Sequence, residues 1–183
     1  TYEGIASEKA GIIKPHSIVV SASQKEPAMN VIRNKVKEKN SRLYTYGRDF
    51  FARRTSVSLE GQEFRFYSGK ESFFPLKTPL IGTHQIENMA LAIQTVRLLN
   101  KINLPVKKEA LYEGMSTVSW PCRFQVLKQD PVIIIDGAHN PDGIRTLSIT
   151  LADVFPEKRF SFLVGILKDK DWHTMLRILL KNN

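Results

Sequence analysis

The chain is poor in several residues on which common protein classes depend. Cys122 is the only cysteine among 183 residues, so an intramolecular disulfide is impossible. One cysteine and four scattered histidines also argue against a structural zinc site. No apolar run approaches the roughly 18 residues that span a bilayer, and the first residues lack the apolar core of a signal peptide. We therefore expect a cytoplasmic protein without membrane contact.

A further absence concerns phosphate binding. The sequence contains no G-x-x-x-x-G-K-[ST] phosphate loop. It is nevertheless strongly basic, with a formal net charge of +9 spread over small clusters such as "RNKVKEK". Nucleic acid is one partner for such a charge, but no zinc finger or RNA-binding signature accompanies it. Anionic small molecules are served equally well, and we expect small-molecule substrates and no nucleic acid.

Hydrophobic periodicity predicts a mixed α/β fold in two parts, 1–121 and 122–183, joined near Pro121. Apolar residues at helical spacing predict helices over 1–10, from Pro27 onward, and over 82–100, 107–117, 142–154 and 172–180. Alternating or short apolar runs predict strands over 17–22, 42–47, 124–127, 132–135 and 160–164, and a hairpin over 54–67. Beyond Pro121 the order of strands and helices predicts the start of a parallel α/β sheet.

The stretch "VIIIDGAHNPDG" from Val132 to Gly143 is the most informative in the chain. A β-branched apolar run leads directly into Asp136, and His139 and Asn140 follow just before a predicted helix. Ligands of parallel sheets bind beyond the carboxyl ends of strands, and the start of a helix suits anions. The pattern therefore predicts a polar site. For Asp136 or Asn140 taken singly, capping of the turn and helix is the simpler interpretation.

Four motifs in order resemble the folylpolyglutamate synthases, some of which are also dihydrofolate synthases, in the Mur ligase superfamily. These are "IASEKAGIIKP", "THQIENMALAI", "WPCRF" with "DGAHNPDG", and "GILKDKD". The resemblance covers nearly the whole chain but only the C-terminal part of such an enzyme. It implies the latter part of a Mur-ligase-type central ATPase domain followed by the start of a Rossmann-like C-terminal domain. It also implies a monomer.

The resemblance implies an ATP-dependent ligase that adds L-glutamate to folate through an acyl phosphate, with Mg²⁺ assisting. Members that are also dihydrofolate synthases act on dihydropteroate, and the sequence does not separate the two kinds. In the family the phosphate loop and the main metal ligands lie upstream of the region matched here. We therefore expect that the 183-residue chain alone does not catalyse ligation.

The resemblance also implies roles for individual residues. Asn88, Arg123 and Asp136 match residues that contact ATP, and His139 matches a histidine near the phosphates and the incoming glutamate. Lys9 matches a lysine that CO₂ converts to a carbamate, whose oxygens hold Mg²⁺. His84 and Gln85 are weaker matches, and Asp171 is expected to cap the last helix.

Simpler interpretations of these residues stay open. Lys9 and Arg123 also fit solvated surface charges, and Asn88 fits a solvated helix face. Where the family has "PGR", this chain has "PCR", with Cys122 in place of the glycine. If that position needs a positive φ, the cysteine would strain the backbone.

Two other functions also remain open. One is a Mur ligase for cell-wall precursors, against which "DGAHNP" argues, and the other is a non-catalytic nucleotide-binding module.

Overall fold

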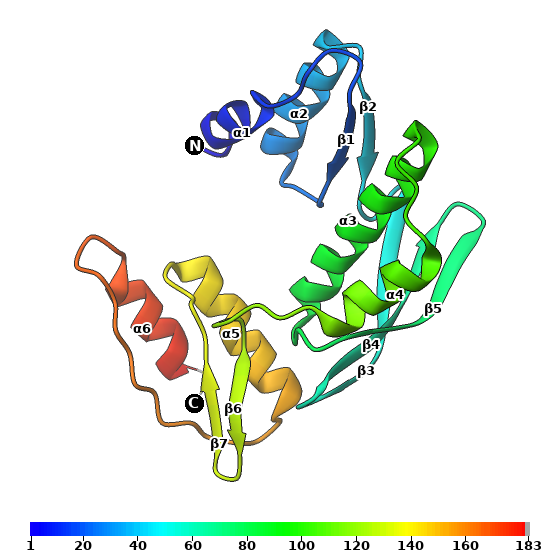
Figure 1. The fold of residues 1–183 in the computed structure, drawn as a ribbon. Coiled ribbons are helices and arrows are strands. Elements are labelled where there is room, and N and C mark those ends of the chain that lie inside the picture. The colour runs from blue at the N-terminus through cyan, green and yellow to red at the C-terminus, as the bar shows by residue number, and fades with distance from the viewer. Residues whose placement is uncertain (182–183) are drawn as a thin grey trace. The chain divides into compact units, whose positions relative to one another are not determined.

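The computed structural model describes residues 1–181, and these fall into two compact units. The first unit comprises Thr1–Arg53, Phe64–Leu76 and Ile86–Met115, and the second comprises Arg54–Glu63, Lys77–Gln85 and the chain from Ser116 onward. Figure 1 shows the elements in chain order. The sequence-based boundary at 121/122 stays a prediction, because the units are divided differently and both contain more than one segment.

The first unit begins with helices packed on a small parallel sheet. Helix α1 (Tyr2–Ala10) precedes strand β1 (Ile18–Ser21), and helix α2 (Glu26–Glu38) precedes strand β2 (Arg42–Thr45). The two strands pair in parallel, as a strand–helix–strand connection requires. Their core is apolar and is made by Ala10, Ile13 and Val36 with partly buried Val19, Val31, Ile32 and Leu43.

A three-stranded sheet follows in the order β3 (Phe50–Ser58), β4 (Gly61–Ser68) and β5 (Glu71–Thr78). Gln62, Phe64 and Phe66 are buried at every second position of β4, which confirms the predicted period of two. Helix α3 (Thr83–Leu99), a short 3₁₀ turn (Asn100–Ile102) and helix α4 (Lys108–Thr117) complete this part. The predicted hairpin and both predicted helices are therefore present.

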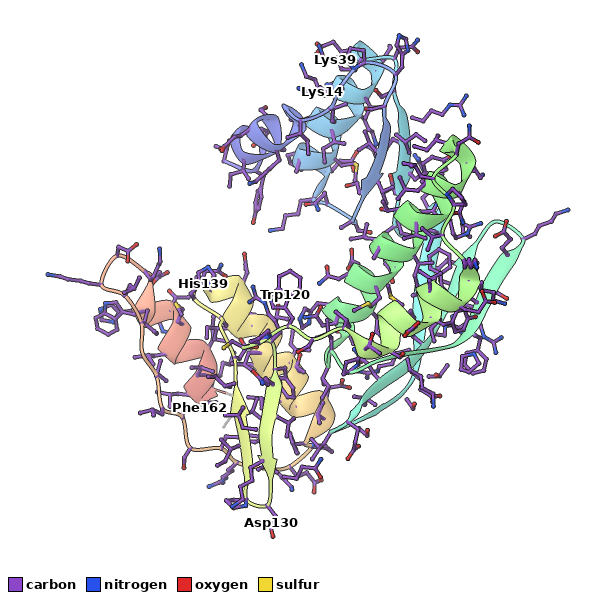
Figure 2. All side chains as sticks on the ribbon, in the orientation of Figure 1. Lys14, Lys39, Trp120, Asp130, His139 and Phe162 are labelled. Carbon is purple, nitrogen blue, oxygen red and sulfur yellow. The ribbon has the colours of Figure 1, made fainter. Side chains whose placement is uncertain are left out.

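The second unit is built on a hairpin and two helices. Strands β6 (Gln125–Gln129) and β7 (Val132–Ile135) precede helix α5 (Pro141–Val154) and helix α6 (Trp172–Lys181). Figure 2 shows Asp130 at the tip of the hairpin and Phe162 in the segment between the helices. One buried cluster joins Ile81, Phe124, Leu151 and Phe155, and another joins α5 to α6 through Ile144, Met175 and Leu179.

One detail of the expected sheet is wrong, because residues 160–164 form no strand and α5 is therefore not followed by a parallel partner for β7. Strands β6 and β7 pair with each other in antiparallel orientation. Phe160 and Phe162 are partly buried against the core, whereas Ser161 and Leu163 between them are exposed. This alternation produced the apparent strand pattern. A strand also needs a hydrogen-bonded neighbour, which a burial pattern does not supply.

No helix among residues 1–181 is long and apolar enough to cross a membrane.

Candidate functional site

The loop after β7 is organised by the carboxylate of Asp136. Its Oδ2 accepts a hydrogen bond from the backbone N–H of Phe124 at 2.8 Å, and its Oδ1 accepts one from Ala138, also at 2.8 Å. The first bond reaches across to the residue before β6, and the second closes a local turn. Asp136 therefore holds two loops together, beyond the helix-capping role that the sequence alone suggested.

The segment Cys122–Phe124 forms a tight turn that presents Arg123. Cys122 and Phe124 both have positive φ, 59° and 44°, and the buried Phe124 ring anchors the turn in the core. The carbonyl of Cys122 accepts the N–H of Gly137 at 2.8 Å. Arg123 itself is exposed, its guanidinium lies beside Gly137, and it makes no ion pair within residues 1–181. An unpaired guanidinium is free to bind a phosphate.

The positive φ of Cys122 yields a stability prediction. A residue with a Cβ in this conformation costs roughly 1–2 kcal/mol relative to glycine, and a β-branched residue costs more. We expect Cys122→Gly to raise the free energy of unfolding by up to about 1 kcal/mol, and Cys122→Val to lower it by roughly 1–2 kcal/mol. Urea unfolding of both variants measures this, and equal midpoints would show that the turn carries no strain.

The start of α5 lies directly after this loop. Asn140 caps the helix, because its side-chain oxygen accepts the N–H of Gly143 at 2.8 Å, so the capping interpretation is confirmed for Asn140. His139 is exposed just before the cap, as Figure 2 shows, and its Nδ1 lies 2.9 Å from the Gly137 carbonyl oxygen. The positive end of the helix dipole and the exposed imidazole together favour an anion here.

His84, in the first turn of α3, also belongs to this part of the second unit. Its ring lies against Gly82, and burial lowers its pKa below the usual value. Asp136 opposes this shift and Arg123 adds to it, so both charges act on the imidazole. Because the pKa is lowered, His84 is predominantly neutral near pH 7.

The structure brings together only some of the residues that the sequence singled out. Arg123, Asp136 and His139 all lie in the second unit, within one pair of hydrogen-bonded loops. Asn88 and Lys9 lie in the first unit, where both are exposed, on α3 and α1 respectively. Lys9 is thus not buried in its own unit, although burial would favour the neutral amine that a carbamate requires. The ligand contacts of all five remain predictions.

Two residues of this region were not singled out from the sequence. Gln62, on β4, donates hydrogen bonds from Nε2 to the carbonyls of Leu80 at 2.7 Å and Gly82 at 2.8 Å. Thr150, on α5, is only 2% exposed and its hydroxyl lies close to Gly82. Both come from segments far apart in the chain, and no motif marks them. The period of two places Gln62 on the buried face of β4 but does not indicate its hydrogen bonds.

The described residues do not by themselves form a metal site. Within residues 1–181 there is no group of three or more His, Cys, Asp and Glu side chains that could hold an ion. A Mg²⁺ ion needs several oxygen ligands in near-octahedral geometry. The donor set present here does not fit that requirement.

Comparison with known proteins identifies the class to which this fold and these loops belong. The Mur ligase middle domain matches residues 1–96, and the Mur ligase glutamate ligase domain matches residues 122–181. The chain therefore belongs to the Mur ligase family. This also confirms the mixed α/β fold class that the sequence predicted.

Within that family the chain is similar to folylpolyglutamate synthases. It is 35% identical over 181 residues to the dihydrofolate synthase/folylpolyglutamate synthase of Bacillus subtilis, covering 98% of this chain and 42% of the relative. It is also 35% identical over 176 residues to the folylpolyglutamate synthase of Lacticaseibacillus casei, covering 96% and 41%. The resemblance predicted from the motifs is confirmed, and the chain spans less than half the length of these relatives.

Solved structures give the same result. A folylpolyglutamate synthase complex with AMPPCP and folate matches with a TM-score of 0.92 and 34% identity, over 100% of this chain and 44% of that one. The Mycobacterium tuberculosis folylpolyglutamate synthase complexed with ADP matches with a TM-score of 0.82 and 30% identity, over 97% and 40%.

Proposed function

We propose that this chain is part of an ATP-dependent ligase that joins L-glutamate to a folate, and that its loop at Arg123 binds the nucleotide. The observation that carries the proposal is the exposed, unpaired guanidinium of Arg123, held beside the Asp136 loop at the start of α5. Similarity to synthases whose structures hold AMPPCP, ADP and folate supports ATP and folate as the substrates.

In the proposed reaction a folate carboxylate takes the terminal phosphoryl group of ATP, which gives an acyl phosphate and releases ADP. The amine of L-glutamate then attacks the acyl carbon, and the C–N bond forms as inorganic phosphate leaves and the amine loses a proton. Arg123 binds a phosphate with its planar fork, and His139 with the N-terminus of α5 adds positive potential for the anionic groups. Asp136 holds both loops in place and also contacts the nucleotide. Asn88 is proposed to contact ATP from α3, and Lys9 to act as a carbamate. Such ligases use Mg²⁺, and we propose that its ligands lie mainly outside this chain, because residues 1–181 contain no suitable cluster.

The proposal extends to the protein's surroundings. We propose a cytoplasmic monomer that binds small molecules rather than nucleic acid or membrane. Anionic substrates such as folate and ATP would suit the net charge of +9, and the similarity to a dihydrofolate synthase/folylpolyglutamate synthase supports this choice. A salt-sensitive mobility shift of DNA or RNA at low micromolar protein would contradict this part of the proposal.

One alternative retains specific support. The absence of a G-x-x-x-x-G-K-[ST] loop from the sequence also fits a module that binds nucleotide without catalysing ligation. A different Mur-type amino-acid ligase is disfavoured by the similarity to folylpolyglutamate synthases. In both alternatives Arg123 would still bind a nucleotide, whereas the acceptor would differ.

The test is the binding of AMPPCP to the 183-residue chain by isothermal titration calorimetry. We expect Arg123→Ala to weaken binding by about 10- to 100-fold, because hydrogen bonds to charged groups contribute roughly 1.5–3 kcal/mol. Arg159→Ala removes the same charge from another exposed position of the second unit and should leave affinity unchanged. Equal affinities of wild type and Arg123→Ala would contradict the assignment of Arg123.

A further inference from the structure

Two buried polar atoms converge on the turn that leads into α3. Within residues 1–181, the buried side-chain nitrogen and oxygen atoms that lack a hydrogen-bond partner are Oε1 of Gln62 and Nδ1 of His84. Buried polar groups are nearly always satisfied, so each exception calls for a reason. Both side chains touch Gly82, since Gln62 donates to its carbonyl and the His84 ring lies against it. The two atoms therefore belong to one small cluster, which we call the Gly82 cluster and which comprises Gln62, Leu80, Gly82 and His84.

Gln62 fixes the backbone of this cluster. It is 4% exposed, and its amide nitrogen donates to the carbonyls of Leu80 and Gly82 at 2.7 and 2.8 Å. Both carbonyls lie in the connection between β5 and α3. Carbonyl oxygens can only accept, so the amide nitrogen must face them and the amide oxygen is left without a donor. Gln62 therefore fixes the conformation of the turn, although its amide oxygen is left without a hydrogen bond.

The conformation of this turn determines the position of His84. The Gly82 carbonyl also accepts the N–H of Gln85 at 3.0 Å, so the same oxygen sets the first turn of α3. The His84 ring then lies against Gly82. The Thr150 hydroxyl also lies close to Gly82, but it already donates its hydrogen bond to the Thr146 carbonyl at 2.8 Å. The charged groups that act on the seated imidazole are Asp136 and Arg123.

We propose that Gln62 is a positioning residue of the candidate nucleotide site, whose two hydrogen bonds hold the Gly82 turn so that His84 is seated beside Arg123 and Asp136. Gln62 acts through the turn and touches no reacting group. The consequence for nucleotide affinity rests on the proposed function, whereas the seating of His84 does not. The two parts are therefore separable by experiment.

The test compares Gln62→Met with wild type in the 183-residue chain. Methionine retains the length and apolar stem of glutamine but donates no hydrogen bond. We expect the ring ¹⁵N resonances of His84 to shift in NMR spectra and its pKa to rise, because an unseated imidazole is less buried. AMPPCP affinity should fall about tenfold. The matched control is Glu63→Gln, the next residue of β4, whose side chain pairs with Lys77 at the surface. It should change neither measurement.

The outcomes separate the two parts of the proposal. A folded Gln62→Met variant with unchanged His84 resonances and unchanged pKa would overturn the positioning role. A wild-type chain that does not bind AMPPCP, combined with shifted His84 resonances in the variant, would remove the proposed function but keep the positioning role. Hydrogen exchange of the Gln62 side-chain amide in the wild type needs no variant. Slow exchange supports the two hydrogen bonds, and exchange at the rate of a free amide overturns them.

Discussion

Gly82→Ala should destabilise the protein by about 3 kcal/mol or more and displace His84. Gly82 has a φ of +116°, a value that residues with a side chain rarely adopt. A Cβ at this position would lie 2.6 Å from Cε1 of His84 and 3.0 Å from the Thr150 hydroxyl oxygen. The methyl group therefore strains the backbone and overlaps a ring and a helix side chain that are themselves packed. Nothing flexible is available to move aside cheaply.

Urea unfolding measures the loss, and Gly69→Ala provides the matched control. Gly69 also has a positive φ, of 58°, but a Cβ there would have nothing within 4 Å. The control should therefore lose only the backbone contribution, about 1 kcal/mol. The difference between the two variants reports the steric part. Equal losses would show that His84 and Thr150 are not packed against Gly82 as described.

Asp136→Asn should destabilise the protein by roughly 2–3 kcal/mol, the second largest effect. Each carboxylate oxygen accepts a backbone N–H at 2.8 Å, from Phe124 and from Ala138. An amide has one oxygen, so it can satisfy one of these donors while its NH₂ group faces the other. One of the two bonds would be lost, and the loop that presents Arg123 would loosen. AMPPCP affinity should therefore fall together with stability.

Differential scanning calorimetry and AMPPCP titration of the same samples test this prediction. Asp142→Asn removes the same charge from the first turn of α5, where the carboxylate is exposed and pairs with Arg145 at the surface. That surface pair contributes about 0.2–1 kcal/mol, so the control should lose less than Asp136→Asn. A loss of stability in Asp136→Asn no larger than in the control would show that the two backbone hydrogen bonds are not important.

Most of the helices could be predicted because their signals are local. In α3 the spacing of Ile86, Met89, Ala90 and Ile93 predicted a buried face, and all four are buried. The predicted cap of α6 is also confirmed, because Oδ1 of Asp171 accepts the N–H of Thr174 at 3.2 Å. In both cases the residues that define the element are neighbours within one or two turns, where sequence spacing and spatial distance agree.

The features that could not be predicted correctly depend on partners far away in the chain. Residues 160–164 have the alternation of a strand but no paired neighbour, so the strand predicted there does not form. Gln62 reaches the candidate site through carbonyls of Leu80 and Gly82, backbone groups whose position no side-chain pattern encodes. The site residues carried over from the family resemblance remain predictions, because the structure locates them without showing what they bind.

The buried cluster around Phe124 limits how the chain can be divided or recombined. Ile81 belongs to it, and Val57 and Leu59 pack against it, although all three precede the predicted boundary at 121/122. Phe124, Leu151 and Phe155 follow that boundary. Exchanging everything after residue 121 with the corresponding part of a relative would therefore join half of one apolar core to half of another. A functional exchange of this segment therefore requires matching changes at Val57, Leu59 and Ile81, which pack in the same core.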